Sequence, residues 1–426
     1  MAVNELPFAG IKVLDLTHAR AGPTSVRLLS DWGADTIKIE QPEATSTDKG
    51  SILGARTGFD LQNLHRNKKS LTVNLKTEEG KELFFELVKK SDVIVENFRS
   101  QTKIRLGVDY ESCAKVNPRI VYGSLSGFGQ DGPYDNRPGV DQILQGMGGL
   151  MSVTGLPGQG PVRVGIPICD LTSGMFLGFG LAAALFERES SGKGQWVQTS
   201  LLQAIVAMMD FQAARYLKDG EIPKQAGNDH PTGVPTGVFP TSDGHINIAA
   251  AGEVLFLRFC NSVGLEWLPK DPRFNTYEGR SANRKELNDE IGKVTSTNTS
   301  KHWVDMMQEV GVPCGPIYDM GDVFNDPQVQ HLGMAWPMKG SAGDFPVVRT
   351  PIVMSRTNVD DEVRLPTPTL GQHTDDILAD LGYDDENLES GSSFADSSAP
   401  GRGSASSNDY DPYSQYYGLL RSPDST

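Results

Sequence analysis

The stretch VRVGIPICDLTSGMFLGFGLAAALFE, residues 162–187, decides how the rest of the chain is organised. Residues 175–186 are apolar or glycine throughout, which predicts a helix that is buried on every side. An apolar run of about a dozen residues is too short to span a bilayer, so a core helix is expected. Gly174, Gly178 and Ala182 recur at every fourth position and predict a bare ridge for close helix packing.

A single acid, Asp170, lies at the start of this helix, after the apolar residues Val164, Ile166 and Ile168. Asp170 could be an N-cap whose carboxylate accepts hydrogen bonds from free backbone amides. It could also be an ionised carboxylate that is held at the positive end of the helix dipole and acts as a nucleophile. The helix alone does not separate these two interpretations.

Length and composition narrow the class of protein. A chain of 426 residues accommodates two or three domains, or one large discontinuous domain. Its apolar fraction of 38% is ordinary for a soluble protein, and we expect no membrane span. The net charge of −15, without a basic stripe, disfavours nucleic-acid binding, although a few local Arg and Lys side chains can still bind phosphates.

The cysteines and the start of the chain bear on its environment. The opening MAVNELPFAG has no cationic segment followed by an apolar one, so we expect no secretion signal. The seven histidines form no pair at metal-ligand spacing, and the four cysteines lie far apart. We therefore expect reduced thiols, a cytoplasmic location and no metal site. The cysteines are Cys113, Cys169, Cys260 and Cys314.

A strand–helix–strand unit opens the chain, with strands at residues 11–16 and 35–40 and a helix at 23–32. The loop THARAGP after the first strand contains His18 and Arg20, at the position where α/β folds bind ligands. His18 could equally be a loop histidine bonded to nearby backbone. Further strands are expected at 67–76, 92–96, 120–124 and 195–199, and helices at 77–90 and 201–217, the last with Ser200 as N-cap.

Residues 127–132 match the pattern GxGxxG, which opens a helix in dinucleotide-binding folds. The segment that follows, PYDNRP, cannot easily extend a helix. We therefore expect a loop there and reject a nicotinamide site.

Composition also predicts the domain boundaries, because glycine and proline punctuate residues 218–240 without periodicity. We expect the N-terminal part of a large domain at 1–217, a linker at 218–240, a small domain at 241–325 and a return to the large domain at 326–388. The returning part should contain a strand at 347–354 and a helix at 375–381. Residues 389–426, rich in Ser and Asp, are expected to be disordered.

Several ordered blocks, from about Leu6 to Asp384, resemble the family III coenzyme A transferases of the formyl-CoA transferase and carnitine-CoA transferase type. The blocks include GIKVLDLTHARAGP, GADTIKIEQP, NKKSLTVNLK, VIVENFR with RLGVDY, and NPRIVYGSLSGFGQDGPY. Later blocks include PVRVGIPICDLTSGM, TGVFPTSDGHINIA, DPRFNTYEGR, GVPCGPIYDM and LGQHTDDIL. The Ser-rich tail lies outside the resemblance.

The resemblance implies a covalent role for Asp170. In this family the matching acid attacks an acyl-CoA thioester, and an aspartyl-CoA thioester then carries the CoA to a carboxylic acid acceptor. It also implies coenzyme A as a substrate, with no tightly bound cofactor, and CoA contacts at His18, Val73, Lys76, Asn97, Phe98 and Arg105. An alternative for each basic residue is a solvated surface charge. A family arginine is replaced by Gln41 here, so phosphate binding could move to Arg66 or Lys69.

The fold that the resemblance implies is α/β: a Rossmann-like large domain built from both ends of the chain, and a small α+β domain. Two such subunits interlock in the family, so we expect a homodimer, with no nucleic-acid or membrane partner.

Two rival functions stay open. Racemases that act on 2-methylacyl-CoA share this fold and pair the aspartate with a histidine. The matching segment here is Gly139-Val140-Asp141, and valine cannot transfer a proton, although Glu253 matches a further racemase acid. A CoA-binding protein without catalysis would not need Asp170.

Two regions of the sequence restrict the identity of the acceptor acid. Residues 228–238 lack the long glycine run that covers the site in oxalate-using formyl-CoA transferases, which disfavours that substrate pair. Arg20 lies where those enzymes have a glutamine close to the acceptor. A cation there could bind the distal carboxylate of a dicarboxylic acid such as glutarate, malate, citramalate or mesaconate, with succinyl-CoA as donor. Arg20 could equally contact a CoA phosphate or an internal acid.

Overall fold

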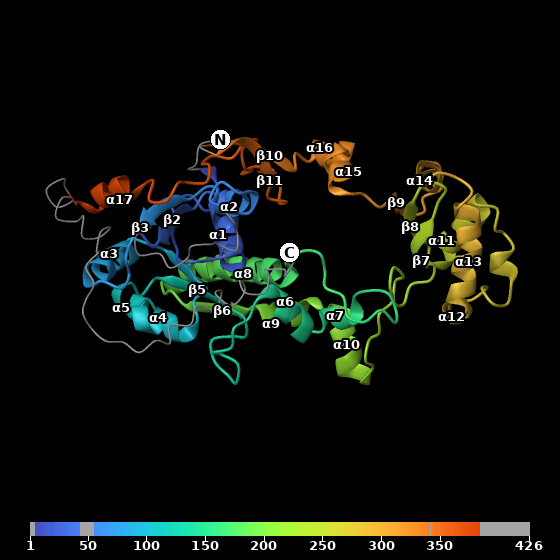
Figure 1. Ribbon diagram of the computed structural model, residues 1–426, viewed down its shortest axis with the longest axis horizontal. Helices are drawn as coiled ribbons and strands as arrows, with labels where there is room; N and C mark the ends of the chain where they lie inside the picture. The colour runs from blue at the N-terminus through green and yellow to red at the C-terminus, as the bar shows by residue number, and fades with distance from the viewer. Residues whose placement is uncertain (1–4, 43–54, 341, 384–426) are drawn as a thin grey trace, which may run out of the picture. The chain divides into compact units, whose positions relative to one another are not determined.

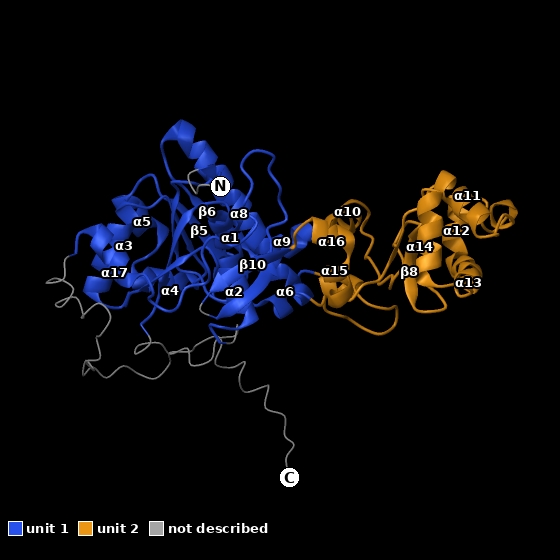
Figure 2. Ribbon diagram, turned by 90° about the horizontal axis from the view of Figure 1, so that it is seen from above, with its two compact units in different colours: residues 1–148, 166–209, 335–426 blue, residues 149–165, 210–334 orange. Residues whose placement is uncertain are grey.

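The structure is a computed structural model that describes residues 5–42, 55–340 and 342–383 (Figure 1). The chain forms two compact units (Figure 2): unit 1 comprises residues 1–148, 166–209 and 335–426, and unit 2 comprises 149–165 and 210–334. Unit 1 therefore combines described segments that are far apart in the sequence, up to residue 148, at 166–209 and at 335–383. The domain boundaries expected from the sequence stay a prediction, and the tail at 389–426 lies outside the described residues.

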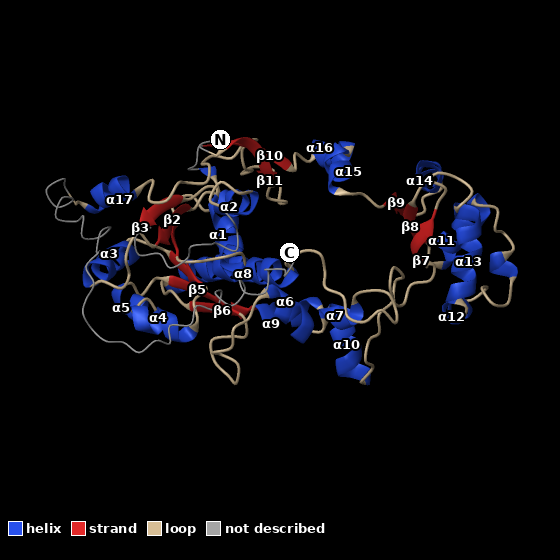
Figure 3. Ribbon diagram, viewed as in Figure 1, coloured by secondary structure: helices blue, strands red, loops and turns tan. Residues whose placement is uncertain are grey.

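A six-stranded parallel sheet organises unit 1, as the α/β pattern predicts (Figure 3). Its order is β3-β2-β1-β4-β5-β6, so the strand order reverses between β1 and β4. Parallel sheets bind ligands at the carboxyl ends of the strands beside such a reversal. The strands are β1 (Lys12–Asp15), β2 (Asp35–Glu40), β3 (Lys69–Thr72), β4 (Val93–Glu96), β5 (Val121–Ser126) and β6 (Trp196–Ser200).

Helices flank this sheet and follow most of the predicted ranges. Ser200 caps α9 as expected, because its side chain accepts a hydrogen bond from the backbone of Gln203. The helices are α1 (Ala21–Asp31), α2 (Phe59–His65), α3 (Glu78–Lys89), α4 (Ser100–Leu106), α5 (Tyr110–Val116), α6 (Asp141–Met147), α8 (Ile168–Ser191), α9 (Leu201–Met208) and α17 (Thr374–Leu381). Residues 127–138 form a loop, which confirms that the GxGxxG match opens no helix.

Helix α8 packs closely along α1, as the small-residue ridge predicts (Figure 1). A Cβ atom on Gly174 would lie 2.6 Å from the carbonyl oxygen of Ala21, and one on Gly178 would lie 2.9 Å from Leu28. Because contacts advance along both helices together, α1 and α8 run parallel. Their N-terminal ends therefore lie side by side.

The expectation that α8 is buried on every side is wrong. Met175, Phe176, Phe179 and Phe186 are exposed, the last to 83%. Helix α8 is also the one described helix whose length and apolar composition would suffice to cross a membrane, contrary to our expectation of none. Half of its most apolar window is buried, and its glycine ridge packs on α1, which is typical of a core helix.

The C-terminal part of the chain covers the edge of the sheet at β3. The backbone N–H of Ser70 donates to His373 Nδ1 at 3.1 Å, and the Ser70 carbonyl accepts from His373 N at 3.0 Å. Gly371 N also donates to the Ser70 hydroxyl at 2.9 Å. These bonds protect an edge strand that would otherwise offer free backbone groups.

The returning strand differs from its prediction. The strand β11 (Gly343–Val348) ends before residue 354 and pairs antiparallel with β10 (Ala335–Gly340) in a separate two-stranded sheet. Trp336 and Met338 of β10 pack in a small core with Trp32, at the end of α1.

Unit 2 has its own α+β core. Its antiparallel sheet has the order β7-β8-β9, with β7 (Thr236–Pro240), β8 (His245–Ala249) and β9 (Cys314–Pro316). Buried residues such as Phe256, Phe259 and Ile291 form the core. The helices are α7 (Leu150–Val153), α10 (Asp210–Asp219), α11 (Glu253–Ser262), the 3-10 helix η3 (Leu268–Lys270), α12 (Tyr277–Ala282), α13 (Arg284–Thr295), α14 (Ser300–Glu309), α15 (Met320–Asn325) and α16 (Pro327–His331).

The secondary structure around residues 201–240 differs from the expected elements at two places. The expected helix at 201–217 is two helices, α9 and α10, because Asp210 adopts a positive φ of 40° that interrupts the helix. The expected linker at 218–240 contains the strand β7, since residues 236–240 pair with β8.

Candidate active site

Asp170 is the third residue of α8, and the N-cap position is occupied by Pro167. Pro167 provides no side-chain cap, and a carboxylate from another helix takes that place. The backbone N–H of Cys169 donates to Asp141 Oδ1 at 2.8 Å. The N-cap interpretation of Asp170 is therefore wrong: Asp141, at the start of α6, binds the free amide of α8, and the carboxyl group of Asp170 is left for other use.

The carboxyl group of Asp170 has an unusual electrostatic environment. Burial raises its pKa from 3.8 to about 7, the negative charge of Asp141 adds to the rise, and the positive charge of Arg20 opposes it. Among the described residues, no side chain donates a hydrogen bond to this carboxyl group. The carboxyl group of Asp170 therefore takes up a proton at a higher pH than an ordinary aspartate does, which differs from the expectation of an ionised carboxylate.

Asp141 is held in place by its own helix. Gln145 Nε2 donates to Asp141 Oδ2 at 2.7 Å and to the carbonyl oxygen of Ile166 at 3.2 Å. These bonds link α6 to the segment that leads into α8. In the sequence, Asp141 draws notice only as part of the segment Gly139-Val140-Asp141. The sequence does not reveal that Asp141 binds the start of α8, since Asp141 lies 28 residues before Cys169.

Arg20 immediately precedes α1, at its N-cap position. Its guanidinium donates from Nη2 to Asp60 Oδ2 at 2.6 Å, and both side chains are about one-fifth exposed. Asp60 lies in the first turn of α2. The structure thus contains the internal acid that the sequence left as an alternative partner of Arg20, and it brings Arg20 within electrostatic range of Asp170.

His18, Asn97 and Phe98 come together where the strand order reverses. Asn97 follows β4, and its side chain accepts from the backbone of His18 at 2.8 Å and donates to the His18 carbonyl at 2.8 Å. The rings of His18 and Phe98 lie 5.7 Å apart. Glu96 Oε2 accepts from the backbone of Phe98 at 2.7 Å, which fixes the turn after β4.

The other predicted CoA contacts lie at the same carboxyl ends of the strands or on the helix that follows. Val73 comes directly after β3 and is buried, with its backbone bonded to Glu40. Lys76 is exposed in the turn before α3, and Arg105 is exposed on α4. The predicted CoA contacts, which are far apart in the sequence, thus lie at or close after the carboxyl ends of the strands.

The suggestion that Arg66 replaces the missing family arginine is wrong. Arg66 is only 1% exposed, and its Nε and Nη2 atoms bind the two oxygens of Asp31 at 3.0 and 2.8 Å. A guanidinium in such a bidentate buried pair has no face left for a phosphate. Lys69 pairs with Asp35 at 2.9 Å but stays about one-third exposed, and Gln41 is exposed after β2.

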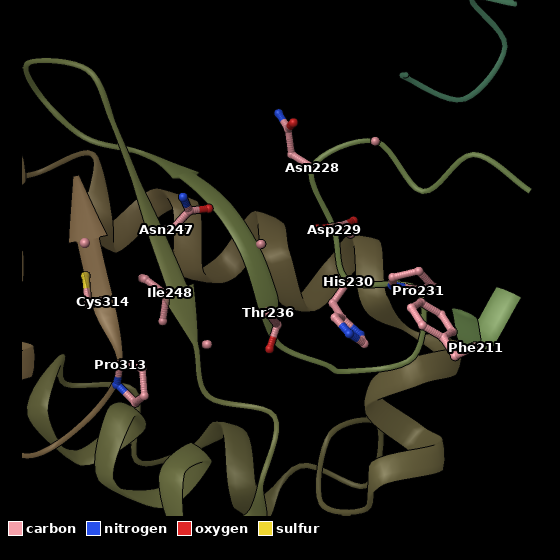
Figure 4. Close-up of a pocket in the computed structure, with 14 residues that line it drawn as sticks. Phe211, Asn228, Asp229, His230, Pro231, Thr236, Asn247, Ile248, Pro313 and Cys314 are labelled. Atoms are coloured by element: carbon pink, nitrogen blue, oxygen red, sulfur yellow. The ribbon is translucent and has the colours of Figure 1, made fainter. Parts of the chain in front are cut away.

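Unit 2 contains a hollow of about 730 Å³ in which the ring of Phe211 stacks on His230 (Figure 4). His230 Nδ1 accepts from the backbone of Gly233 at 2.8 Å, so the proton of the neutral ring lies on Nε2. Asn228 and Asp229 line the same hollow. This is the segment 228–238 in which the sequence lacks a glycine run.

The cysteine thiols and the possible metal ligands bear on the chemistry that this site can perform. All four cysteines are free thiols, and burial and the charge of Asp141 raise the pKa of Cys169 to about 12. Within residues 5–42, 55–340 and 342–383, no three His, Cys, Asp or Glu side chains are arranged to hold a metal ion.

Comparisons with known proteins identify relatives of this chain in sequence and in fold. The sequence profile of CoA-transferase family III matches residues 8–374. A succinate–glutarate CoA-transferase of Agrobacterium fabrum is 36% identical over 88% of this chain and 96% of its own. An acetyl-CoA:oxalate CoA-transferase of Acetobacter aceti is 38% identical over 77% of this chain and 85% of its own. The crystal structure of a CAIB/BAIF family protein from Brucella suis superposes with a TM-score of 0.77, at 35% identity, over 88% of this chain and 99% of its own.

Proposed function

The chain belongs to CoA-transferase family III, and on this premise we propose that it moves coenzyme A from succinyl-CoA to a dicarboxylic acid through covalent intermediates on Asp170. The observation that carries the proposal is the carboxyl group of Asp170: it is partly buried at the start of α8, lacks a hydrogen-bond donor among the described side chains, and has a pKa raised to about 7. Asp141 takes over the capping role that would otherwise occupy it.

The reaction proceeds in four exchanges of one bond for another. An oxygen of Asp170 attacks the thioester carbonyl of the donor, the C–S bond breaks, and a mixed anhydride and CoA thiolate form. The thiolate attacks the aspartyl carbonyl and releases the donor acid, which leaves an aspartyl-CoA thioester. The acceptor carboxylate then attacks that thioester, and the released thiolate attacks the acceptor's carbonyl, which forms the new acyl-CoA and regenerates Asp170.

The raised pKa of Asp170 suits this sequence. A more basic carboxylate is a stronger nucleophile than an ordinary aspartate, and it is still available at pH 7 to 8. Partial burial keeps water from the anhydride and the thioester, whose energy would otherwise be lost by hydrolysis.

Coenzyme A binds, in this proposal, at the reversal between β1 and β4. His18, Asn97 and Phe98 form a rigid group there, and Lys76 and Arg105 supply exposed cations for phosphate oxygens. The strand order β3-β2-β1-β4-β5-β6 supports a Rossmann-like fold for this part of the chain.

The acceptor is proposed to be a dicarboxylate that uses Arg20 for its distal carboxylate. Asp60 engages Nη2 of Arg20, and among the described residues no other side chain takes the remaining guanidinium N–H groups, so they can bind a second carboxylate. The names of the two relatives contain glutarate and oxalate, which are both dicarboxylates and are consistent with this class.

A homodimer is proposed from the exposed face of α8. Met175, Phe176 and Phe179 leave a contiguous apolar surface beside the turn that carries Asp170, which a second subunit would cover. Analytical ultracentrifugation of the wild type should give twice the chain mass, and Phe179→Glu should shift the protein toward the monomer. A monomeric wild type would overturn this part of the proposal.

The decisive experiment is mass spectrometry of the intact protein after brief incubation with succinyl-CoA, trapped by hydroxylamine or borohydride. We expect a CoA adduct or a trapped aspartyl product on the wild type and on Glu189→Gln, an exposed acid of the same helix. Asp170→Asn should give neither and should lose activity at least about 10⁴-fold. An equal adduct on Asp170→Asn would exclude Asp170 as the nucleophile.

The same assay separates the rival functions. Turnover over a panel of donors, including acetyl-CoA, and of dicarboxylate and monocarboxylate acceptors identifies the substrate pair. A racemase would instead exchange the α-proton of a 2-methylacyl-CoA for deuterium without an acceptor acid. Glu253, the candidate second acid for that reaction, is paired with Arg280 at 3.1 Å in unit 2.

A further inference from the structure

Asp170 and Arg20 lie at the neighbouring ends of two parallel helices. Gly174 contacts the carbonyl of Ala21, the first residue of α1, and Asp170 lies one helical turn before Gly174 on the same face of α8. Because the helices run parallel, this face of Asp170 points toward the residues that precede α1. Arg20 is the last of those residues, which explains its electrostatic effect on Asp170.

The guanidinium of Arg20 is nonetheless committed elsewhere. Its Nη2 atom donates to Oδ2 of Asp60, in the first turn of α2, at 2.6 Å. An arginine side chain is long enough to exchange partners, and a free guanidinium pairs with the nearest accessible carboxylate. Without Asp60, Asp170 would be such a partner.

We infer that Asp60 is a positioning residue for the reaction: by binding Arg20 it keeps this cation from forming an ion pair with Asp170. The inference rests on the proposed function, since it concerns the freedom of the nucleophile. A carboxylate that accepts two guanidinium hydrogen bonds is a weaker nucleophile, because its lone pairs are engaged and its negative charge is stabilised. Asp60 thus preserves both the reactivity of Asp170 and the orientation of the guanidinium for an acceptor.

The charged groups that act on Asp170 are few. Asp141 raises its pKa from the side of α6, Arg20 lowers it from the start of α1, and the neighbouring thiol of Cys169 stays neutral. A closer approach of Arg20 is therefore the change that would move the titration of Asp170 most strongly to lower pH.

The test compares wild type, Asp60→Asn, Arg20→Gln and the double variant between pH 5 and 9. The readout is the rate of adduct formation on Asp170 with acetyl-CoA, a donor without a distal carboxylate, and with succinyl-CoA. In Asp60→Asn the acidic limb of the profile should move about one pH unit or more lower, and the rate at pH 8 should fall about tenfold. In the double variant the acidic limb should return to that of Arg20→Gln, because the competing cation is gone.

A second measurement needs no substrate. Urea unfolding across the same pH range reports the titration of Asp170 through stability, and Asp60→Asn should shift that titration to lower pH as well. Asp92→Asn is the matched control, because Asp92 also pairs with an arginine, Arg188, and is similarly exposed. It should lose stability without any change in the titration.

The outcomes separate the two hypotheses. Absence of an adduct on the wild type with every donor would overturn the proposed function, while the unfolding measurement would still test the role of Asp60. An unchanged titration in Asp60→Asn, or a shift that persists in the double variant, would overturn the positioning role.

Discussion

Two aspartates of unit 1 behave in opposite ways: Asp15, at the end of β1, is fully buried, and Asp170, in the first turn of α8, is partly buried. The pKa of Asp170 is raised to about 7. Burial alone would raise the pKa of Asp15 too, but the charges of Lys68 and Lys38 outweigh it and hold the pKa well below its usual range. Lys68 Nζ lies 2.8 Å from Asp15, and both side chains are fully buried.

The pKa values of the two aspartates differ because of nearby positive charge more than because of burial. Glu96 shows an intermediate case. It is buried and paired with one lysine, Lys103, at 2.9 Å, yet burial still raises its pKa. Asp15, with two nearby lysines, organises the loop toward His18, because it accepts from the backbone of Thr17 at 2.9 Å and Lys38 donates to the Thr17 carbonyl at 2.8 Å. Nearby lysines thus compensate the charge of Asp15, whereas only Arg20 opposes the raised pKa of Asp170, the proposed nucleophile.

Replacing Lys68 by Met would remove the cation that lies 2.8 Å from Asp15 and would leave Lys38 as the remaining nearby lysine. We expect a loss of about 3–5 kcal/mol in the free energy of unfolding, because a buried charge would lose its partner. Urea unfolding at pH 7 measures the loss. The double variant with Asp15→Leu removes both charges and should recover part of it. A loss below about 1 kcal/mol in the single variant would contradict the compensating role of Lys68.

Replacing Asp170 by Asn should stabilise the protein above pH 7. The folded-state pKa of about 7 lies above the ordinary 3.8, so the native state of the wild type binds the proton more tightly than the unfolded state does. Proton binding therefore stabilises the folded wild type fully below about pH 4, and this contribution is lost as the pH rises to 7. The loss is at most about 4 kcal/mol, and less for a partly exposed group.

Urea unfolding at pH 5, 6, 7 and 8 tests this sign. The advantage of Asp170→Asn over wild type should grow by about 2 kcal/mol from pH 5 to pH 8 and should then stay constant. The exposed Glu189→Gln serves as the control with no such trend. A wild type that becomes more stable than the Asn variant as the pH rises would refute the raised pKa.

Replacing Gly174 by Ala would disturb the site of Asp170 without touching its charge. The added Cβ would meet the carbonyl of Ala21 at 2.6 Å, so α8 must move away from α1, at a cost of about 1–3 kcal/mol. The temperature of thermal unfolding and the rate of adduct formation on Asp170 should both fall. Gly292→Ala, in a helix where the nearest atoms lie at 3.6 Å, should leave stability equal or slightly higher.

Replacing His65 by Leu should have the smallest effect on stability. It tests the hydrogen bond between His65 and Lys68, the lysine that pairs with Asp15. His65 Nδ1 lies 3.3 Å from Lys68 Nζ, and burial with the nearby lysines lowers the pKa of His65, so the neutral ring accepts a hydrogen bond. The loss of this acceptor should cost about 1 kcal/mol of stability. His65→Gln, which keeps an acceptor, should cost less, and equal losses would show that packing alone matters.

Local patterns predict most of unit 1. The ranges of β1, α1 and β2 follow from short periodic runs with clear turn residues, and β2 matches residues 35–40 without change. The position of Asp170 at the start of α8 follows from the same reasoning. Each of these features depends on residues that are close in the sequence.

Long-range pairing explains what the sequence does not reveal. Arg66 looks free until Asp31, 35 residues earlier, is placed beside it, and Arg20 looks free until Asp60 is placed beside it. The exposed face of α8 is equally hidden, because an apolar residue gives the same signal whether its own chain or another surface covers it. The break at Asp210 has no glycine or proline to mark it.

The protection of β3 by residues 371–374 has a consequence for synthesis on the ribosome. The strand emerges about 300 residues before the segment that bonds to Ser70, which at about 5–20 residues per second is a delay of roughly 15–60 seconds. During that interval the nascent chain carries an open sheet edge. Translation speed and chaperone access during this interval should therefore influence the yield of this protein.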